Sequence, residues 1–287
     1  MRGGRISSGW TLAKRSWAVL RADRSLAWFP VVSGLAAIGA AALIFGPAAA
    51  IYSSSSGSSG AVVIVAAVIG VFVLTWIAVF FNTAIAAAAS KSLVGQDTTM
   101  NDGFAVARER IGGITQWAIA QATVGLVLTA IRQALGDSLI GQVFAGLLSF
   151  AWGAATFFVV PVLALEGAGP REAFKRSVSV LRARWGEGVV GTVSVSAVVF
   201  LVVMLPAIVV GGAGLALLSA APAAGGVLFA VAAVGLLIGV VIANTLQSIF
   251  RVALFEFATN ERAVGGFDPA ELQGAFAPKK RRGLLGR

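Results

Sequence analysis

The chain contains no cysteine and no histidine, and only 12% of its 287 residues are charged. Without cysteine it forms neither disulfide bonds nor thiolate nucleophiles, and without histidine it has no imidazole ligand for a metal. A soluble domain usually carries about 25% charged residues, so this composition lacks the polar surface that water requires. The composition therefore excludes thiol chemistry and favours a protein that resides in a membrane.

Apolar residues make up 58% of the chain and gather in six uncharged runs. A hydrocarbon core about 30 Å thick needs roughly 20 apolar residues in a helix, and each run is long enough. We therefore predict an all-α, polytopic membrane protein whose six-span domain covers residues 28–256. The predicted spans are 28–51, 61–89, 114–131, 142–165, 188–218 and 225–250.

The 22 lysines and arginines are distributed in alternate gaps between these spans, with Arg132 as the single exception. Cytoplasmic segments carry the excess of Lys and Arg, so the alternation predicts that both termini are cytoplasmic. Arginine-rich, Ala- and Gly-rich composition is typical of a prokaryote, which predicts the plasma membrane as the location. The Lys and Arg residues that flank the spans on the cytoplasmic side account for the net charge of +10. No recognised nucleic-acid-binding module accompanies this charge, so we do not expect nucleic acid as a partner.

Two nine-residue stretches, 14–22 and 175–183, share seven residues, and each precedes an outward-going span. In the first, an apolar stripe containing Trp10 and Trp17 adjoins basic residues, as in helices that lie in the membrane interface. A weaker version around Phe104 precedes the third span. The pattern predicts three repeats, each an interfacial helix followed by a two-span hairpin.

The segments outside the membrane domain are predicted to be an amphipathic helix in residues 1–27 and a basic tail in residues 257–287. Near an anionic leaflet each basic residue contributes about 1 kcal/mol to binding, so membrane lipids with anionic headgroups are the expected partners. A protein partner at the cytoplasmic face is the alternative for the tail. The candidate headgroup contacts are Lys14, Arg15, Arg21, Lys175, Arg176, Arg182, Lys279, Lys280, Arg281 and Arg282.

No ionisable residue lies at the centre of a predicted span. Such residues mark proton relays, voltage sensors and intramembrane acid–base pairs, so we predict a protein that is not an enzyme, with no catalytic residue, metal or cofactor. Glu166 and Arg251 lie at comparable depths at the inner ends of spans four and six, and we predict a buried ion pair between them. Snorkelling of Arg251 toward headgroups is the alternative.

Uncharged polar residues concentrate on spans three and six. Thr245 on span six belongs to this set, and so does Thr156 on span four. They either hydrogen-bond between helices, at roughly 0.6–2 kcal/mol each, or line a polar path for a solute or lipid headgroup. The candidates for that path are Gln116, Gln121, Asn244 and Gln247.

Four segments carry a family resemblance: Gly9–Trp17, Phe157–Gly167, Lys175–Glu187 and Gly266–Pro269. Together they resemble a family of prokaryotic six-span membrane proteins known only as a domain of unknown function. More remotely, the layout is similar to the membrane domain attached to some glycerophosphodiesterases, whose catalytic domain and metal-binding residues have no counterpart in this sequence. The resemblance implies six spans and an integral membrane location, and it implies no catalytic or binding residues.

Two functions remain open from the sequence. The first is a membrane scaffold or accessory factor that binds lipid and partner proteins through its cytoplasmic helices. The second is a transporter or permeation protein that uses the polar residues of spans three and six. A polar cavity reaching the middle of the membrane would favour transport, and a filled apolar interior would favour the scaffold.

Overall fold

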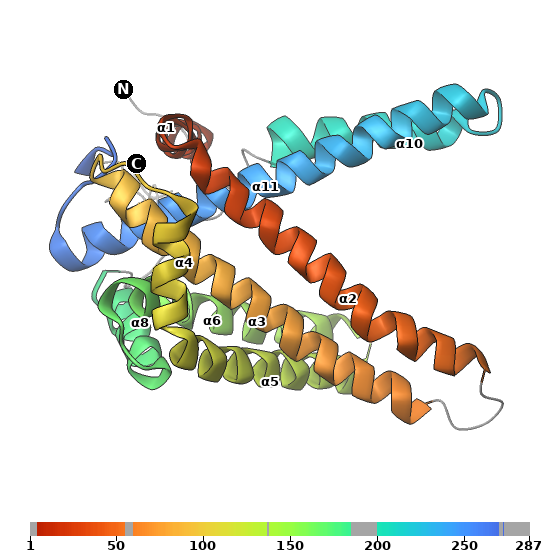
Figure 1. Ribbon diagram of the computed structural model, residues 1–287, viewed down its shortest axis with the longest axis horizontal. Coiled ribbons are helices and arrows are strands. Elements are labelled where there is room, and N and C mark those ends of the chain that lie inside the picture. The colour runs from red at the N-terminus through yellow and green to blue at the C-terminus, as the bar shows by residue number, and fades with distance from the viewer. Residues whose placement is uncertain (1–4, 55–59, 137, 185–199, 270–271, 273–287) are drawn as a thin grey trace, which may run out of the picture. The chain divides into compact units, whose positions relative to one another are not determined.

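The computed structural model describes residues 5–54, 60–136, 138–184, 200–269 and 272, and every regular element among them is helical. Within these residues six helical segments are long and apolar enough to cross a membrane, which confirms the all-α, multi-span prediction (Figure 1). The first part of the predicted fifth span, 188–199, lies outside the described residues. The six segments are Arg24–Ser54, Gly60–Leu93, Ile111–Leu135, Leu139–Glu166, Phe200–Leu217 and Pro222–Asn260.

The chain divides into two compact units, and the first of them comprises residues 28–91 and 97–179. Within it the Trp76 indole donates a hydrogen bond to the Thr115 hydroxyl at 2.9 Å, which links the second and third spans. Its elements are α2 (Trp28–Ser54), α3 (Gly60–Leu93), α4 (Met100–Glu109), α5 (Ile111–Leu135), α6 (Leu139–Ala155), α7 (Val159–Pro161), the π-helical turn η2 (Val162–Glu166) and the first part of α8 (Pro170–Arg184).

The second unit comprises residues 1–27, 92–96 and 180–287. Its elements are α1 (Arg5–Ala22), the 3-10 turn η1 (Arg24–Ala27), the π-helical turn η3 (Phe200–Met204), α10 (Leu205–Leu217) and α11 (Pro222–Asn260). Helices α10 and α11 pack along each other, and α1 packs against α11 (Figure 1). A Cβ atom on Gly214 would lie 2.7 Å from the Phe229 nitrogen, so the α10–α11 contact requires a small residue there.

The final span extends beyond its predicted end at residue 250, because α11 is 39 residues long and ends at Asn260. Phe255 and Phe257 in this extension are buried, and Phe250 lies 6.4 Å from Phe267 between ring centroids. Gly265, at a φ of +65°, donates its N–H to the Leu93 carbonyl at 2.9 Å. The described residues that follow α11 therefore fold back onto their own unit through apolar packing.

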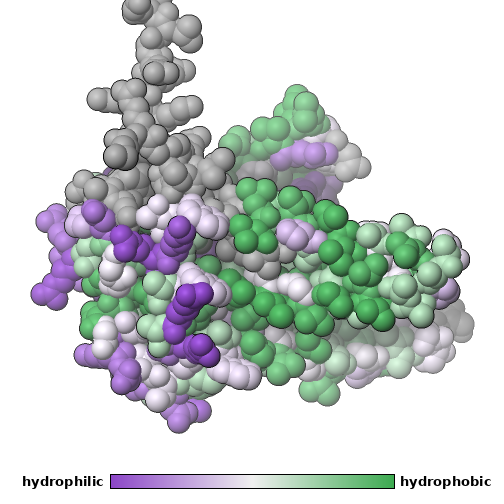
Figure 2. Space-filling model, turned by 90° about the horizontal axis from the view of Figure 1, so that it is seen from above, coloured by the Kyte–Doolittle hydropathy of each residue, from purple (hydrophilic) through white to green (hydrophobic). Residues whose placement is uncertain are grey.

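Large apolar side chains cover the outer surfaces of the spans (Figure 2). On α2, Leu43 is 79% exposed, and on α6, Ile140 is 84% exposed. A soluble protein rarely exposes such continuous apolar surface. Lipid tails are as apolar as leucine, so these faces suit hydrocarbon.

Helix α1 packs in its unit through a face that lies beside its aromatic stripe. The buried residues are Leu12, Ala13, Ser16, Val19 and Leu20, whereas Trp10 and Trp17 are 43% and 37% exposed. At about 100° per residue, Trp17 lies about 40° and Trp10 about 60° from Ala13 around the helix axis, so the stripe borders the packed face and remains exposed. Its placement in the membrane interface stays a prediction.

Candidate functional site

The exposed face of α1 carries two aromatic–basic pairs. Lys14 Nζ lies 5.4 Å from the Trp10 ring centroid, and Arg21 Cζ lies 5.8 Å from the Trp17 centroid. Because each residue of a helix turns about 100°, these four side chains fall within about 60° of one another around the axis. We call these four residues the α1 stripe. Tryptophan is enriched where a membrane meets water, and lysine and arginine are attracted to anionic headgroups.

Asp23 directly follows α1, one position after the helix ends at Ala22. Its Oδ1 atom accepts hydrogen bonds from the Ser25 backbone N–H at 3.0 Å and from the Ser25 hydroxyl at 2.6 Å. The next turn, η1, begins at Arg24 and buries Leu26 completely. The α1 stripe therefore lies on a helix that is followed at once by a turn with hydrogen bonds between Asp23 and Ser25.

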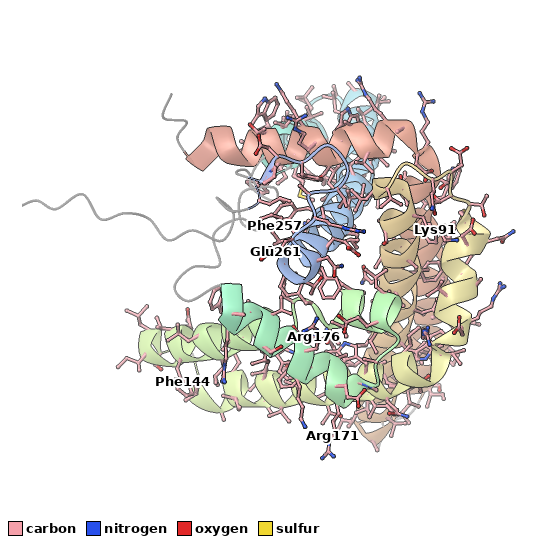
Figure 3. The ribbon with its side chains drawn as sticks, turned by 90° about the vertical axis from the view of Figure 1, so that its left-hand side faces the viewer. Lys91, Phe144, Arg171, Arg176, Phe257 and Glu261 are labelled. Atoms are coloured by element: carbon pink, nitrogen blue, oxygen red, sulfur yellow. The ribbon has the colours of Figure 1, made fainter. Side chains whose placement is uncertain are left out.

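Helix α8 presents a second basic surface. Lys175 and Arg182, two of the candidate headgroup contacts, are exposed, and Arg171 projects from the same helix (Figure 3). Arg176 is engaged instead with Glu166, its Nε donating to Oε1 at 3.2 Å. This pair joins α8 to the end of span four within one unit.

Ser177 holds α8 against a break in the fourth span. Helix α6 ends at Ala155, and the chain resumes as α7 at Val159, two residues before Pro161, which has no N–H to donate. The buried Ser177 hydroxyl donates to the Ala155 carbonyl at 2.7 Å and accepts from the Phe158 N–H at 3.0 Å. One side chain on α8 thus satisfies two backbone groups that the interrupted helix leaves unpaired.

Aromatic packing adds to this attachment of α8. The Phe174 ring lies 5.8 Å from Trp152 of α6 and 6.5 Å from Trp117 of α5, between centroids.

Gly167, at a φ of +65°, ends η2, and a Cβ atom there would lie 2.6 Å from Arg110 Cζ. Only glycine accommodates both the left-handed backbone and the close guanidinium.

Helix α4 is attached to α3 in a similar manner. Phe104 packs 5.6 Å from Phe81 and 5.3 Å from Phe29, between ring centroids. A Cβ atom on Gly103 would lie 2.5 Å from the Ala84 carbonyl oxygen, so the two helices touch at this glycine. The sequence indicated Phe104 but gave no signal for the role of Gly103.

The N-terminus of α4 is capped by Thr99 and Asp102. Thr99 accepts from the Asp102 N–H, while the Thr99 hydroxyl donates to Asp102 Oδ2 at 2.7 Å. Lys91 Nζ lies 2.9 Å from Asp102 Oδ1. The Thr99 hydroxyl and the Lys91 ammonium, together with the Thr99 N–H, hold the pKa of Asp102 well below its usual range.

The remaining predicted site residues are distributed over both units. Glu166 is paired with Arg176, and Arg251 is partly buried in the other unit, so the Glu166–Arg251 pair stays a prediction. Arg15 is exposed on α1. The end of the Lys175–Glu187 motif lies outside the described residues. The four candidate contacts of the tail also lie outside them: Lys279, Lys280, Arg281 and Arg282.

The candidate polar path also stays a prediction, because its members belong to different units. Gln116 and Asn244 are exposed, while Gln247 and Gln121 are partly buried. The Gln121 Oε1 atom has no hydrogen-bond partner among the described residues. Two threonines expected to bond between helices instead donate within their own helices, Thr156 to Trp152 and Thr245 to Val241, each at 2.8 Å.

These features define a multi-pass helical membrane protein with short basic helices attached to its spans. The chain belongs to a family of unknown function, DUF6159, whose profile matches residues 61–266. This confirms the predicted family class, although the Gly9–Trp17 motif lies outside the matched residues. None of the curated proteins compared with the chain matches it, and the remote likeness to glycerophosphodiesterase membrane domains stays a prediction.

Proposed function

We propose that the protein is a non-catalytic scaffold or accessory factor that binds anionic lipid headgroups and partner proteins through its short basic helices. The α1 stripe is the observation that carries this proposal. An amphipathic helix with tryptophan beside lysine or arginine suits the headgroup layer, where the ring enters the apolar boundary and the cation contacts phosphate. The membrane spans anchor the protein, and the short basic helices bind lipid headgroups and partner proteins.

The proposed orientation places α1, α4 and α8 on the cytoplasmic side of a prokaryotic plasma membrane, with both termini there. The charge alternation of the sequence supports it, because every lysine and arginine except Arg132 then lies inside. The cytoplasmic leaflet carries the negative surface potential that would attract the stripe. Partner proteins would then meet the same face.

The three short helices also support the proposal of three repeats. Helix α4 packs on α3 through Phe104, and α8 packs on α6 through Ser177 and Phe174. Helix α1 packs on α11 in the second unit. In the proposed topology, each basic helix therefore packs against a span that runs toward the cytoplasm. The three helices thus have equivalent positions in the three proposed repeats.

A fluorescence experiment tests lipid recognition. Because the chain has no cysteine, Ala18→Cys introduces one labelling site on the exposed side of α1. An environment-sensitive label there should shift to shorter wavelength in phosphatidylglycerol vesicles relative to phosphatidylcholine vesicles, and salt should reduce the shift. Lys14→Gln with Arg21→Gln should remove most of it, since two charges contribute about 2 kcal/mol.

The matched control is Arg262→Gln, which removes a charge from an exposed residue outside the α1 stripe. It should leave the spectral shift unchanged. An equal response to both lipids would contradict the proposal. In that case, solute flux through vesicles containing the purified protein, reduced by Gln121→Leu, would favour the transport alternative.

A further inference from the structure

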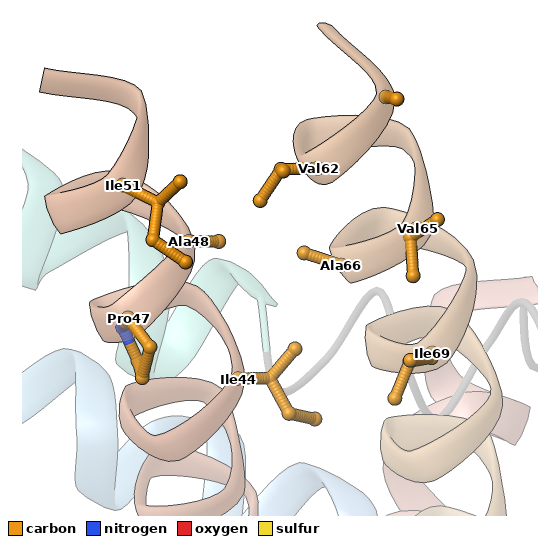
Figure 4. Close-up of a pocket in the computed structure, with 9 residues that line it drawn as sticks. Ile44, Pro47, Ala48, Ile51, Val62, Val65, Ala66 and Ile69 are labelled. Atoms are coloured by element: carbon orange, nitrogen blue, oxygen red, sulfur yellow. The ribbon is translucent and has the colours of Figure 1, made fainter. Parts of the chain in front are cut away.

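A cavity of about 450 Å³ lies between the ends of α2 and α3 that flank the uncharged segment 53–60 (Figure 4). Its volume falls in the range of small-molecule binding sites. All of its lining side chains are aliphatic, without a hydroxyl, amide or charge. They are Ile44, Pro47, Ala48, Ile51, Ala61, Val62, Val65, Ala66 and Ile69.

Small residues create the width of this cavity. Ala48 and Ala66 face it from opposite helices and are each only 8% exposed (Figure 4). Pro47 adds a compact ring beside Ala48. Two leucines at these positions would fill much of the space, so the small side chains of Ala48 and Ala66 leave room between the two helices.

Beside the lining residues Ile44 and Ile69, the Phe45 ring lies directly on the backbone of Gly70, where a Cβ atom would clash with it. From Ile51 back to Ile44 the cavity runs for about 10 Å along α2, at 1.5 Å per residue. Half of a hydrocarbon core is about 15 Å, so the cavity extends through most of one leaflet.

We infer that this cavity binds one acyl chain of a membrane lipid from the leaflet adjoining residues 53–60. Both walls belong to membrane-spanning segments, so hydrocarbon surrounds the opening. The space is open on one side and is not an enclosed void, so its lining atoms gain dispersion contacts only when something from the surroundings occupies it. A flexible hydrocarbon chain fills such a space without desolvating any polar group.

The mouth of the cavity accommodates a headgroup without selecting for its charge. Tyr52, the single tyrosine of the chain, follows the lining residue Ile51 and is exposed, as are Ser53 and Ser54 after it. Tyrosine is favoured at the membrane interface. No lysine or arginine occurs between residues 25 and 90, so we assign the site to a lipid recognised by its chain and not by an anionic head. The inference rests on the membrane location of α2 and α3 and is independent of the α1 stripe.

The test uses the full protein in phosphatidylcholine vesicles that contain a phosphatidylcholine with a diazirine in one acyl chain. Photolysis followed by peptide mass spectrometry should place most adducts of this hairpin on residues 44–51 and 61–69. Ala48→Leu with Ala66→Leu should reduce these adducts several-fold, because the leucines occupy the cavity. The matched control is Ala49→Leu with Ala67→Leu, which adds the same volume at exposed neighbouring positions and should leave the adducts unchanged.

Two results would overturn the inference. Adducts spread evenly around α2 and α3 in the wild type would mean that lipid contacts these helices without a site. Equal labelling of the filled variant and its control would mean that the cavity does not hold the chain. Replacing the probe by a phosphatidylglycerol analogue should give the same adducts, whereas strong preference for the anionic head would contradict the assignment.

Discussion

The Ser177 hydroxyl accepts a hydrogen bond from the Phe158 N–H at 3.0 Å, across a break in the fourth span. The same hydroxyl donates to the Ala155 carbonyl at 2.7 Å. In a membrane no water is present to pair with such backbone groups, so a side chain must do so. This contact makes α8 part of the span's own hydrogen bonding.

Ser177→Ala should therefore lower the free energy of unfolding by about 1–3 kcal/mol, because it leaves a buried donor and a buried acceptor unpaired. The chain offers a matched comparison in Ser16, which occupies the same place in the 14–22 stretch. The Ser16 hydroxyl is buried with no hydrogen-bond partner among the described residues. Ser16→Ala should be neutral or slightly stabilising, as removal of an unsatisfied hydroxyl relieves its desolvation.

Both variants are measured by denaturant-induced unfolding in detergent micelles, followed by circular dichroism. Equal stability losses for the two serines would show that the two hydrogen bonds of Ser177 contribute nothing to the free energy of unfolding. A larger loss for Ser16 would show that its hydroxyl has a role that the structure does not explain.

Gly167→Ala should destabilise the junction between span four and α8 by roughly 1–3 kcal/mol, since a non-glycine residue there adopts a strained backbone. The Cβ atom would also displace the Arg110 guanidinium, which lies 2.6 Å from its position. Gly169→Ala, two residues away, has open space around its Cβ and serves as control. Comparable melting temperatures for the two variants would contradict this role of Gly167.

Asp102→Asn should destabilise the protein at neutral pH, because it removes the negative charge that pairs with Lys91 and replaces one of the two acceptor oxygens by an NH2 donor. The pKa of Asp102 is lowered in the folded state, so its carboxylate stabilises the fold above the usual aspartate range. That contribution is lost as the pH falls from about 4 toward the lower folded-state pKa. The stability difference between wild type and variant should therefore shrink on acidification.

Unfolding curves between neutral and strongly acidic pH measure this difference. Asp97→Asn, at an exposed carboxyl in the same loop, provides the comparison and should change stability little. A difference between wild type and Asp102→Asn that stays constant down to the lowest pH would argue against the capping contribution.

The spans were predictable from sequence because their signal is local. Uncharged runs of sufficient length determine both the presence and the order of membrane helices, and the structure matches the six segments that it describes. The end of α11 was not predictable in this manner. Beyond Arg251 the helix continues through Phe255 and Phe257, which are buried by tertiary packing rather than by lipid alone.

The attachments of the short helices were not predictable, because they depend on residues distant in sequence. The seven-residue identity between 14–22 and 175–183 indicated related helices, yet it gave Ser177 no role. The partners of that serine lie 19 and 22 residues earlier, at a break that an apolar run does not reveal. Similarly, the apolar stripe of α1 gave no indication that Leu12, Ser16 and Val19 pack in the unit.

The central claim is that all three short basic helices lie on one side of a membrane crossed six times. Single cysteines are introduced at Ala18 and Arg108 on α1 and α4, at Lys175 on α8, and at Ser54 and Ala220 in the gaps. A membrane-impermeant maleimide is then applied to intact cells. We predict that the cysteines at Ser54 and Ala220 react at once, while those on the three basic helices react only after permeabilisation. Labelling of any basic-helix cysteine in sealed cells would contradict the account.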